Sequence, residues 1–390
     1  MLRHNAPPEA VEARAALFPQ ELERAGDCGY SPLHLAARSN SPLIHALLKG
    51  GGGRGVCKRC QGGFPVHSAA RQGATLALSS LLEAFPESAR QHDHNGCLPI
   101  HLAAASATLV AEASEGGGEE EPSVSSAHQP TLEERVEALA MLLRAHAEGV
   151  MEADVEGLLP LHYAAMSMPP LRLPAYMSPQ VLIAAGPESA AHEAREGWLP
   201  LTLALVYRAA ADVVASLLEA YPNAAWQRSE SFGCLPIHFA AKYANPRVIG
   251  LLLSANPEAA SIPDSDGRLP LHVAAASRPD ELAIAMLLEH FPSAAHCRDS
   301  DGYLPLHVAV TNEAGAGAVQ RLLNAHPDGA RARVADCQLP LHLAVRSSAP
   351  LEAVVVLLQA YSEAASMRTS EGDLPLHCAQ EAGASADIVE

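Results

Sequence analysis

Aromatic residues are scarce in this sequence: Phe, Trp and Tyr make up 4% of its 390 residues. Basic residues are also outnumbered, since 26 Lys and Arg stand against 44 Asp and Glu and give a formal net charge of −18. A surface this acidic argues against nucleic acid and anionic membranes as main partners, and it favours basic partners. Much of the 48% hydrophobic content is alanine and leucine, and such small residues suit closely stacked helices.

The sequence has no uninterrupted apolar stretch of the length that spans a bilayer, and residues 1–18 contain no apolar signal-peptide core. A disulfide framework is typical of short secreted chains, which this chain is not. We therefore expect reduced thiols and a cytoplasmic or nuclear location. The eight cysteines are scattered: Cys28, Cys57, Cys60, Cys97, Cys234, Cys297, Cys337 and Cys378.

Signatures of catalysis are missing as well: there is no G-x-S-x-G elbow, P-loop, kinase set, H-E-x-x-H or dinucleotide fingerprint. The glycines at 50–53 are followed by Arg54 and Gly55, not by the Lys-Ser/Thr of a P-loop. Acidic pairs such as Asp264 and Asp266 lie in predicted turns, where Asp is favoured for its local backbone bonds. We predict that the chain is not an enzyme and uses no cofactor.

What the sequence has in abundance is one phrase, Pro-(Leu/Ile/Val)-His, preceded by a polar turn. Thr202 holds the histidine position in a further copy, which makes ten copies. The spacings from His238 to the four histidines that follow are 34, 35, 35 and 35 residues. A fixed period of this size indicates a stacked array, in which each repeat packs only on its neighbours. The histidines are His34, His67, His101, His162, His238, His272, His307, His342 and His377.

The phrase resembles the ankyrin repeat, in which a D-x-x-G turn is followed by T-P-L-H-x-A and two antiparallel helices. Residues 264–274 read D-S-D-G-R-L-P-L-H-V-A. The resemblance covers roughly residues 8–390. It implies an all-α ankyrin-repeat solenoid of helix-turn-helix repeats joined by β-turn fingers, acting as a protein–protein interaction scaffold. It also implies that each histidine bonds to the turn region and ties neighbouring repeats together.

The histidines are not expected to bind metal. Neighbouring packed helices lie about 8–10 Å apart, whereas zinc–nitrogen bonds measure about 2.0–2.1 Å. One ion therefore cannot reach histidines that recur once per repeat.

One departure from the family pattern is systematic. The threonine before the proline is Ser31 in the first copy, Phe64 in the second and leucine in the others. A leucine cannot accept the capping bond, which should cost about 1 kcal/mol per helix. If it is buried between repeats, it returns about 1.5–3 kcal/mol. The leucines are Leu98, Leu159, Leu199, Leu235, Leu269, Leu304, Leu339 and Leu374.

The repeat pattern divides the chain into four segments. Residues 1–25 are an N-terminal half-repeat that caps the stack, and 26–105 hold repeats 1 and 2 and the start of repeat 3. Residues 106–131 are an acidic Gly/Glu/Ser-rich insertion, predicted to be disordered or, alternatively, to dock a basic partner. Residues 132–390 complete repeat 3 and hold repeats 4–10, the last of them incomplete.

A lone C-x-x-C pair, Cys57 and Cys60, lies in the glycine-rich stretch at 50–63. It is interpreted as two loop cysteines. The alternative is half of a zinc site that His45 or His67 completes. No second pair follows at the right spacing, so we predict no metal; zinc measured after dialysis decides the question.

By the resemblance, the residue four before the motif histidine and those four and five after it face a concave groove, and these residues vary between copies. Trp, Tyr and Arg are enriched at binding hot spots. Tyr207 and Tyr243 have an alternative interpretation, as residues packed between helices. The predicted partner-binding residues are Trp198, Tyr207, Phe232, Lys242, Tyr243, Arg268 and Tyr303.

We predict that the chain is a monomer that binds a protein partner, with no nucleic acid and no membrane as partner. The alternative function is the recruitment region of a longer enzyme or adaptor whose catalytic part lies outside this chain.

Overall fold

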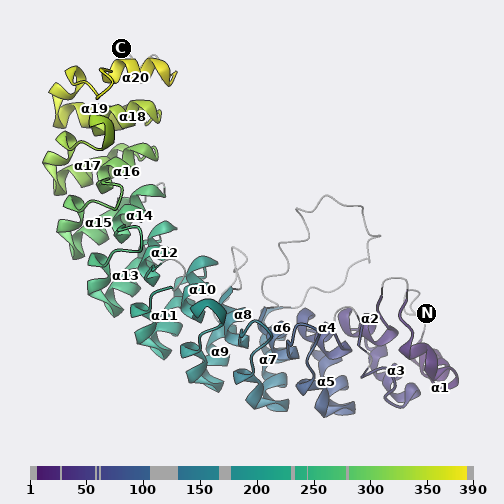
Figure 1. Ribbon diagram of the computed structural model, residues 1–390. Helices are drawn as coiled ribbons and strands as arrows, with labels where there is room; N and C mark the ends of the chain where they lie inside the picture. The colour runs from purple at the N-terminus through teal and green to yellow at the C-terminus, as the bar shows by residue number, and fades with distance from the viewer. Residues whose placement is uncertain are drawn as a thin grey trace. The chain divides into compact units, whose positions relative to one another are not determined.

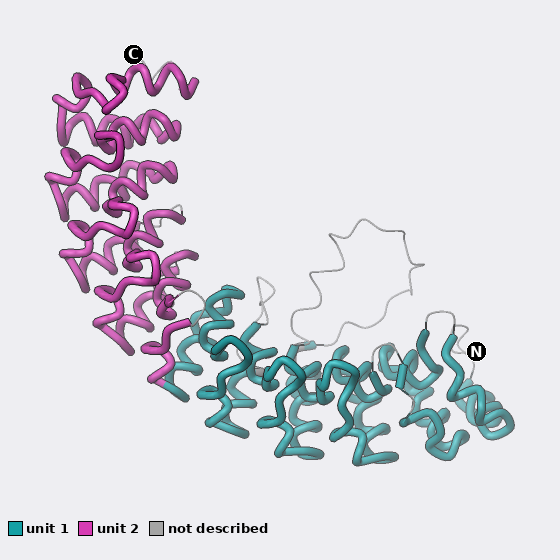
Figure 2. The backbone as a smooth tube through the Cα atoms, viewed as in Figure 1, with its two compact units in different colours: residues 1–221 teal, residues 222–390 magenta. Residues whose placement is uncertain are grey.

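The computed structural model describes residues 7–26, 29–57, 59–60, 63–105, 131–166, 177–229, 233–243, 245–277 and 281–383. Within these ranges the chain forms α-helices, α1 to α20, joined by turns and short 3-10 helices, and contains no β-strand (Figure 1). The predicted all-α repeat fold is confirmed. The chain divides into two compact units, residues 1–221 and 222–390 (Figure 2), which are described separately.

In unit 1 the helices form two layers. The first helices of the repeats pack on one another, and the second helices do the same. The first helices are α2 (Pro32–Arg38), α4 (Pro65–Gln72), α6 (Pro99–Ala105), α8 (Pro160–Met166) and α10 (Pro200–Val206). The second layer holds α1 (Pro8–Leu17), α3 (Leu43–Gly51), α5 (Thr75–Ala84), α7 (Leu132–Ala145), α9 (Met177–Ala185) and α11 (Ala211–Ala220). Because α1 packs on α3, it occupies the place of the second helix of a repeat, and no first helix of that repeat precedes it among the described residues.

Unit 2 repeats the same two layers. Its first helices are α12 (Pro236–Lys242), α14 (Pro270–Ala276), α16 (Pro305–Thr311), α18 (Pro340–Arg346) and α20 (Pro375–Glu381). Its second helices are α13 (Pro246–Ala255), α15 (Glu281–His290), α17 (Ala316–Ala325) and α19 (Leu351–Ala360). Each helix packs on the equivalent helix of the adjacent repeat, so the core runs between the layers along the whole unit.

The motif sequence explains where each first helix starts. Its proline is the first helical residue, a position where the missing N–H has no partner to lose. The leucine before it is extended, as at Leu269 with φ −73° and ψ 160°. Two small residues after the histidine, Ala274 and Ala275 in α14, are completely buried. Such small side chains let the first helices of adjacent repeats approach closely.

Seven of the eight leucines that replace the family's threonine are buried, as their expected compensation requires, and Leu374 in the last copy is half-buried. Leu269 and Leu304 are 4% and 2% exposed. The capping loss is also smaller than the sequence suggests. The N–H of the third helical residue, as in His272, donates to the carbonyl of the leucine itself at 2.9 Å. Since the first position is proline, few first-turn donors are left without a partner.

Short 3-10 helices follow the second helices, and the sequence pattern does not predict them. Proline begins most of them, and its fixed φ suits a first helical position. A pair of small buried residues, such as Ala294 and Ala295, then packs inward. In unit 1 they are η2 (Pro19–Glu23), η3 (Pro86–Arg90), η5 (Ala147–Met151) and η6 (Pro187–Ala191). In unit 2 they are η8 (Pro222–Trp226), η9 (Pro257–Ser261), η10 (Pro292–His296), η11 (Pro327–Arg331) and η13 (Ser362–Ser366).

The glycine-rich stretch that was expected to be a loop from residue 50 onward is partly helical. Gly50 and Gly51 are the last residues of α3. A Cβ atom at Gly50 would lie 2.3 Å from the carbonyl oxygen of Glu12, and one at Gly51 would lie 2.2 Å from Cδ1 of Leu22. These glycines therefore let α1 and η2 approach α3. The predicted insertion lies outside the described residues except for Thr131, whose hydroxyl caps α7.

Candidate partner-binding surface

Aspartates close several of the fingers that join the repeats. In the finger before α14, Oδ1 of Asp264 accepts from the backbone N–H groups of Asp266 at 3.0 Å and Arg268 at 2.8 Å. Asp93, Asp154 and Asp299 close their own fingers in the same way. The interpretation of Asp264 as a turn former is therefore confirmed.

Adjacent fingers also lie against one another. The N–H of Ser300 donates to the carbonyl of Asp266 at 3.0 Å. Gly267 has φ +71°, and a Cβ atom there would lie 2.8 Å from Oγ of Ser300. Both its backbone angle and its close neighbour therefore require glycine.

The motif histidine bonds in two directions. In α16, the N–H of Leu304 donates to Nδ1 of His307 at 3.0 Å, and Nε2 donates to the carbonyl of Ala332 before the next helix pair, also at 3.0 Å. The Nδ1 bond recurs in seven other copies at 3.0–3.3 Å. In the first copy the Ser31 hydroxyl donates to Nδ1 of His34 instead, at 2.6 Å. The implied role, a tie between neighbouring repeats, is confirmed.

These bonds fix the protonation state of the ring. A carbonyl can only accept, so Nε2 carries the hydrogen and Nδ1 is left as an acceptor for the backbone N–H. Burial lowers the pKa of His67, His101, His162 and His307 to about 4. The buried motif histidines are therefore neutral scaffold at pH 7. Both nitrogens of a ring bonded in this way are occupied, so neither is available to a metal ion.

Two of the predicted binding residues lie in unit 1. Trp198 is half-buried at the end of a finger; its carbonyl accepts from Nε2 of His162 at 3.2 Å, and its indole N–H donates to Glu196 at 3.4 Å. Tyr207 follows α10 and is 38% exposed. The interpretation of Tyr207 as a residue packed between helices therefore does not fit its position.

In unit 2, Lys242 ends α12 and Tyr243 follows it. The Lys242 ammonium lies 5.9 Å from the centre of the Tyr243 ring. Lys242 is exposed, whereas Tyr243 is half-buried. The structure thus brings these two predicted residues into contact and leaves the lysine accessible. Phe232 lies outside the described residues.

Arg268 and Tyr303 are the predicted finger residues of the next two copies. Nε of Arg268 donates to Oδ2 of Asp264 at 3.0 Å, and its Nη2 lies 2.9 Å from Asp266. The ring of Tyr303 is half-buried and perpendicular to that of His307, with 6.1 Å between the ring centres. Arg268 is therefore held by its own finger and offers a fixed rather than a mobile cation.

The C-x-x-C alternative gains no support from its surroundings. Cys57 is exposed and Cys60 half-buried. Nε2 of His67 already lies 3.0 Å from the carbonyl of Cys97. No cluster of three or more His, Cys, Asp or Glu side chains suited to a metal occurs in the part of the chain that the structure describes.

Unit 1 also contains a cavity of about 560 Å³ where α1 and η2 meet α2. Phe18, Leu22, Tyr30 and Leu35 line it, with Arg14 at its side. The Arg14 guanidinium is paired with Glu21 at 3.0 Å. The lining of the cavity is thus largely apolar, and the Arg14 guanidinium beside it already has Glu21 as its partner.

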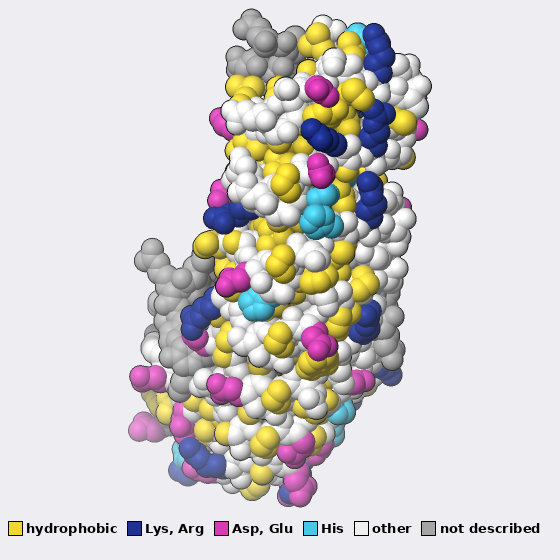
Figure 3. Space-filling view, turned by 90° about the vertical axis from the view of Figure 1, so that its left-hand side faces the viewer, with side chains coloured by type: hydrophobic (Ala, Val, Ile, Leu, Met, Phe, Trp, Pro, Cys, Tyr) yellow, Lys and Arg dark blue, Asp and Glu magenta, His cyan; other side chains and the backbone are white. Residues whose placement is uncertain are grey.

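Sequence reasoning missed one set of exposed residues, the arginines nine residues before the motif histidine in unit 2. Figure 3 shows Lys and Arg side chains in a column along one flank of the array. The sequence contains a signal for these arginines, because Arg298, Arg333 and Arg368 follow one another at intervals of 35 and 35 residues.

Comparison with known proteins agrees with this geometry. A family model described as ankyrin repeats, in three copies, matches residues 237–330, and a single ankyrin repeat model matches residues 28–54. The chain thus contains ankyrin repeats, which are generally modules for protein–protein interaction. No curated protein matches the chain. Among the described helices, none combines the length and apolar character that crossing a membrane requires.

Proposed function

We propose that this chain is a non-enzymatic scaffold that binds a protein partner through the finger and first-helix face of its repeats. One observation carries the proposal: motif residues that recur in nearly all copies are mostly buried, whereas several residues that vary between copies are exposed. His272 is buried and bonded at both nitrogens, whereas Lys242 and Arg268, at varying positions, are exposed.

The composition of the varying positions supports binding in each unit. In unit 2 a tyrosine, a lysine and a fixed arginine lie at the ends of first helices and fingers, and unit 1 offers Trp198 and Tyr207. Aromatic and arginine side chains bind strongly because they bury a large area for few rotatable bonds. The buried thiols support a role without catalysis, since burial raises the pKa of Cys97 to about 11. We further propose a monomer in the cytoplasm or nucleus that binds neither nucleic acid nor membrane.

The test compares capture of cellular proteins by the wild type and by a Tyr243→Ala/Tyr303→Ala variant, with quantitative mass spectrometry. The matched control is Trp226→Ala, since Trp226 is 47% exposed but belongs to η8, which follows a second helix. Loss of a hot-spot pair should reduce recovery of a specific partner by roughly thirty-fold, as about 2 kcal/mol implies. Equal capture by correctly folded wild type and double variant would refute the proposal for unit 2. Trp198→Ala applies the same test to unit 1.

A further inference from the structure

An arginine row lies on unit 2, defined as Arg298, Arg333 and Arg368. These residues hold the same place, nine before the motif histidine, in three consecutive copies, and all are exposed. Pro263 holds this place in the copy before Arg298, and in the first copy of the unit Arg228 lies ten residues before the motif histidine and donates to the carbonyls of Gly233 and Pro263, each at 3.0 Å. Because each copy supplies one member, adjacent members are one repeat apart.

Two members of the row are anchored by the backbone. Nη1 of Arg298 donates to the carbonyls of Gly302 and, at 3.2 Å, of Arg333 in the next finger. Nη1 of Arg368 donates to the carbonyl of Gly372 at 2.5 Å. A guanidinium has five N–H donors, so each anchored arginine keeps further donors for a ligand. Anchoring also reduces the side-chain entropy that binding would remove.

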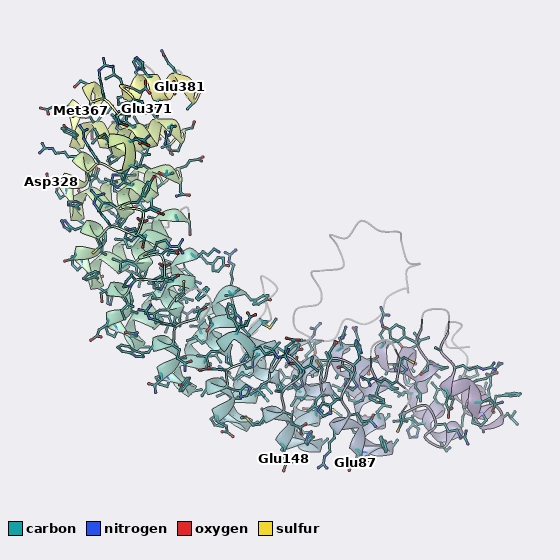
Figure 4. All side chains as sticks on the ribbon, in the orientation of Figure 1. Glu87, Glu148, Asp328, Met367, Glu371 and Glu381 are labelled. Carbon is teal, nitrogen blue, oxygen red and sulfur yellow. The ribbon has the colours of Figure 1, made fainter. Side chains whose placement is uncertain are left out.

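The described residues do not neutralise the charge of the row. Among the described residues, no carboxylate forms an ion pair with any of its three members. The neighbouring Arg331 differs, because it pairs with Asp328 at 3.9 Å and lies 5.1 Å from the centre of the Tyr361 ring. Figure 4 places Asp328 and Met367, the residue before Arg368, at the same outer edge of unit 2. Although the chain as a whole is acidic, the arginine row thus offers positive charges that no described carboxylate pairs with.

The spacing of the row selects the conformation of a ligand. Packed helices of adjacent repeats lie about 8–10 Å apart. A polyproline II segment rises about 3.1 Å per residue with three residues per turn, so every third side chain returns to one face after about 9 Å. A β-strand returns after two residues, about 6.6 Å, which does not match. Duplex DNA carries a charge every ~1.7 Å, and such a continuous polyanion would also meet the carboxylates of the neighbouring fingers, Asp301 and Glu371.

We propose that the arginine row is a docking surface for an extended acidic segment of a protein partner, in polyproline II conformation, with Asp or Glu at every third residue. Each carboxylate pairs with one guanidinium. None of the three arginines is among the predicted partner-binding residues of the finger and first-helix face, and the proposal does not rest on those residues.

The test is fluorescence anisotropy of the full chain with a labelled peptide that carries three Glu at every third position among prolines. An isomer of the same composition with the three Glu adjacent is the ligand control. The first peptide should bind several-fold more tightly, and its affinity should fall as salt is raised from 50 to 300 mM, because exposed ion pairs are screened. Equal binding of the two peptides would overturn the proposal.

Arg333→Ala is the decisive variant, because the Arg333 side chain makes no hydrogen bond or ion pair within the described ranges and its loss should leave the fold intact. It should weaken the peptide by roughly three- to five-fold, as expected for one exposed ion pair. The matched control is Arg321→Ala, which removes the same charge from an exposed arginine paired with Glu281. Tyr243→Ala should leave peptide binding unchanged. An equal effect of the two arginine variants, or oligonucleotide binding that needs Arg333 without peptide binding, would overturn the proposal.

Discussion

Replacing His307 with threonine tests the two-directional histidine bond directly. Threonine fits this place, because Thr202 holds it in copy five, where α10 forms normally and Thr202 is 7% exposed. The change would leave the Leu304 N–H and the Ala332 carbonyl without their partner. A buried polar group left unpaired costs about 1–3 kcal/mol, so we expect a loss of about 2–5 kcal/mol at pH 7.

The loss should depend on pH in a defined direction. Burial lowers the pKa of His307 from 6.5 to about 4 in the folded chain, so the unfolded chain takes up the proton first. The contribution of His307 is therefore fully present above pH 6.5 and disappears as the pH falls toward 4. One pKa unit corresponds to about 1.4 kcal/mol. The advantage of the wild type should thus shrink by about 3 kcal/mol over this range.

Urea unfolding followed by circular dichroism, at several pH values between 7 and 4, measures both quantities. Carboxylates titrate alike in the two proteins and cancel in the difference. His377→Thr is the matched control: His377 holds the same motif position but is exposed, and Nδ1 accepts from Leu374 at 3.3 Å. It should cost less than about 1 kcal/mol at pH 7. A wild-type advantage over His307→Thr that stays constant from pH 7 to 4 would refute the assigned tautomer and bonding.

Three further predictions concern stability. Gly50→Ala should detach α1 from α3 and raise proteolysis of residues 8–17, whereas Gly315→Ala, with nothing within 4 Å of the added Cβ atom, should not. Asn256→Ala should lower the free energy of unfolding by about 2–4 kcal/mol, because this buried side chain accepts from the N–H of Ala259 and donates to the carbonyl of Ala225; an unchanged urea midpoint would contradict it. Leu269→Thr, which restores the family residue, should lower the free energy of unfolding by about 1–2 kcal/mol in the same assay, because the burial that is lost stabilises more than the hydrogen bond that is gained. A more stable variant would show that the capping hydroxyl contributes more than the buried leucine.

The fold was predictable because its signal is periodic. The phrase around His272 recurs often enough to set the repeat, and proline sets the start of each first helix. Burial of Leu269 could also be argued from energy alone. The 3-10 helices could not be predicted from the sequence, because the small residues that they bury, such as Ala294, are ordinary helix formers. Their burial becomes evident only when the neighbouring repeat is present.

The candidate site was predictable only by position. Repeat alignment selected Lys242 and Tyr243, which are consecutive in the chain, and the Lys242 ammonium lies 5.9 Å from the centre of the Tyr243 ring. Alignment of the repeats could not show that Arg268 is held by Asp264 and Asp266. Asp264 is recognisable from the sequence as a turn former, but which groups an arginine side chain reaches depends on the folded finger. The arginine row was visible in the sequence, but its lack of carboxylate partners was not.

The histidine tie has a consequence for how such a chain can change length. Each bond joins the ring of one copy to a carbonyl of the next, so the two halves of a tie lie about one period or less apart, from 25 residues for His307 and Ala332 to 36 for His162 and Trp198; only the tie across the predicted insertion, His101 to Leu158, is longer, at 57. A tandem duplication or deletion of one whole period therefore recreates a complete tie at the new joint, wherever in the repeat the breakpoints fall. Genetic recombination can lengthen or shorten the array without new compensating substitutions, because each added unit brings both the donor and the acceptor.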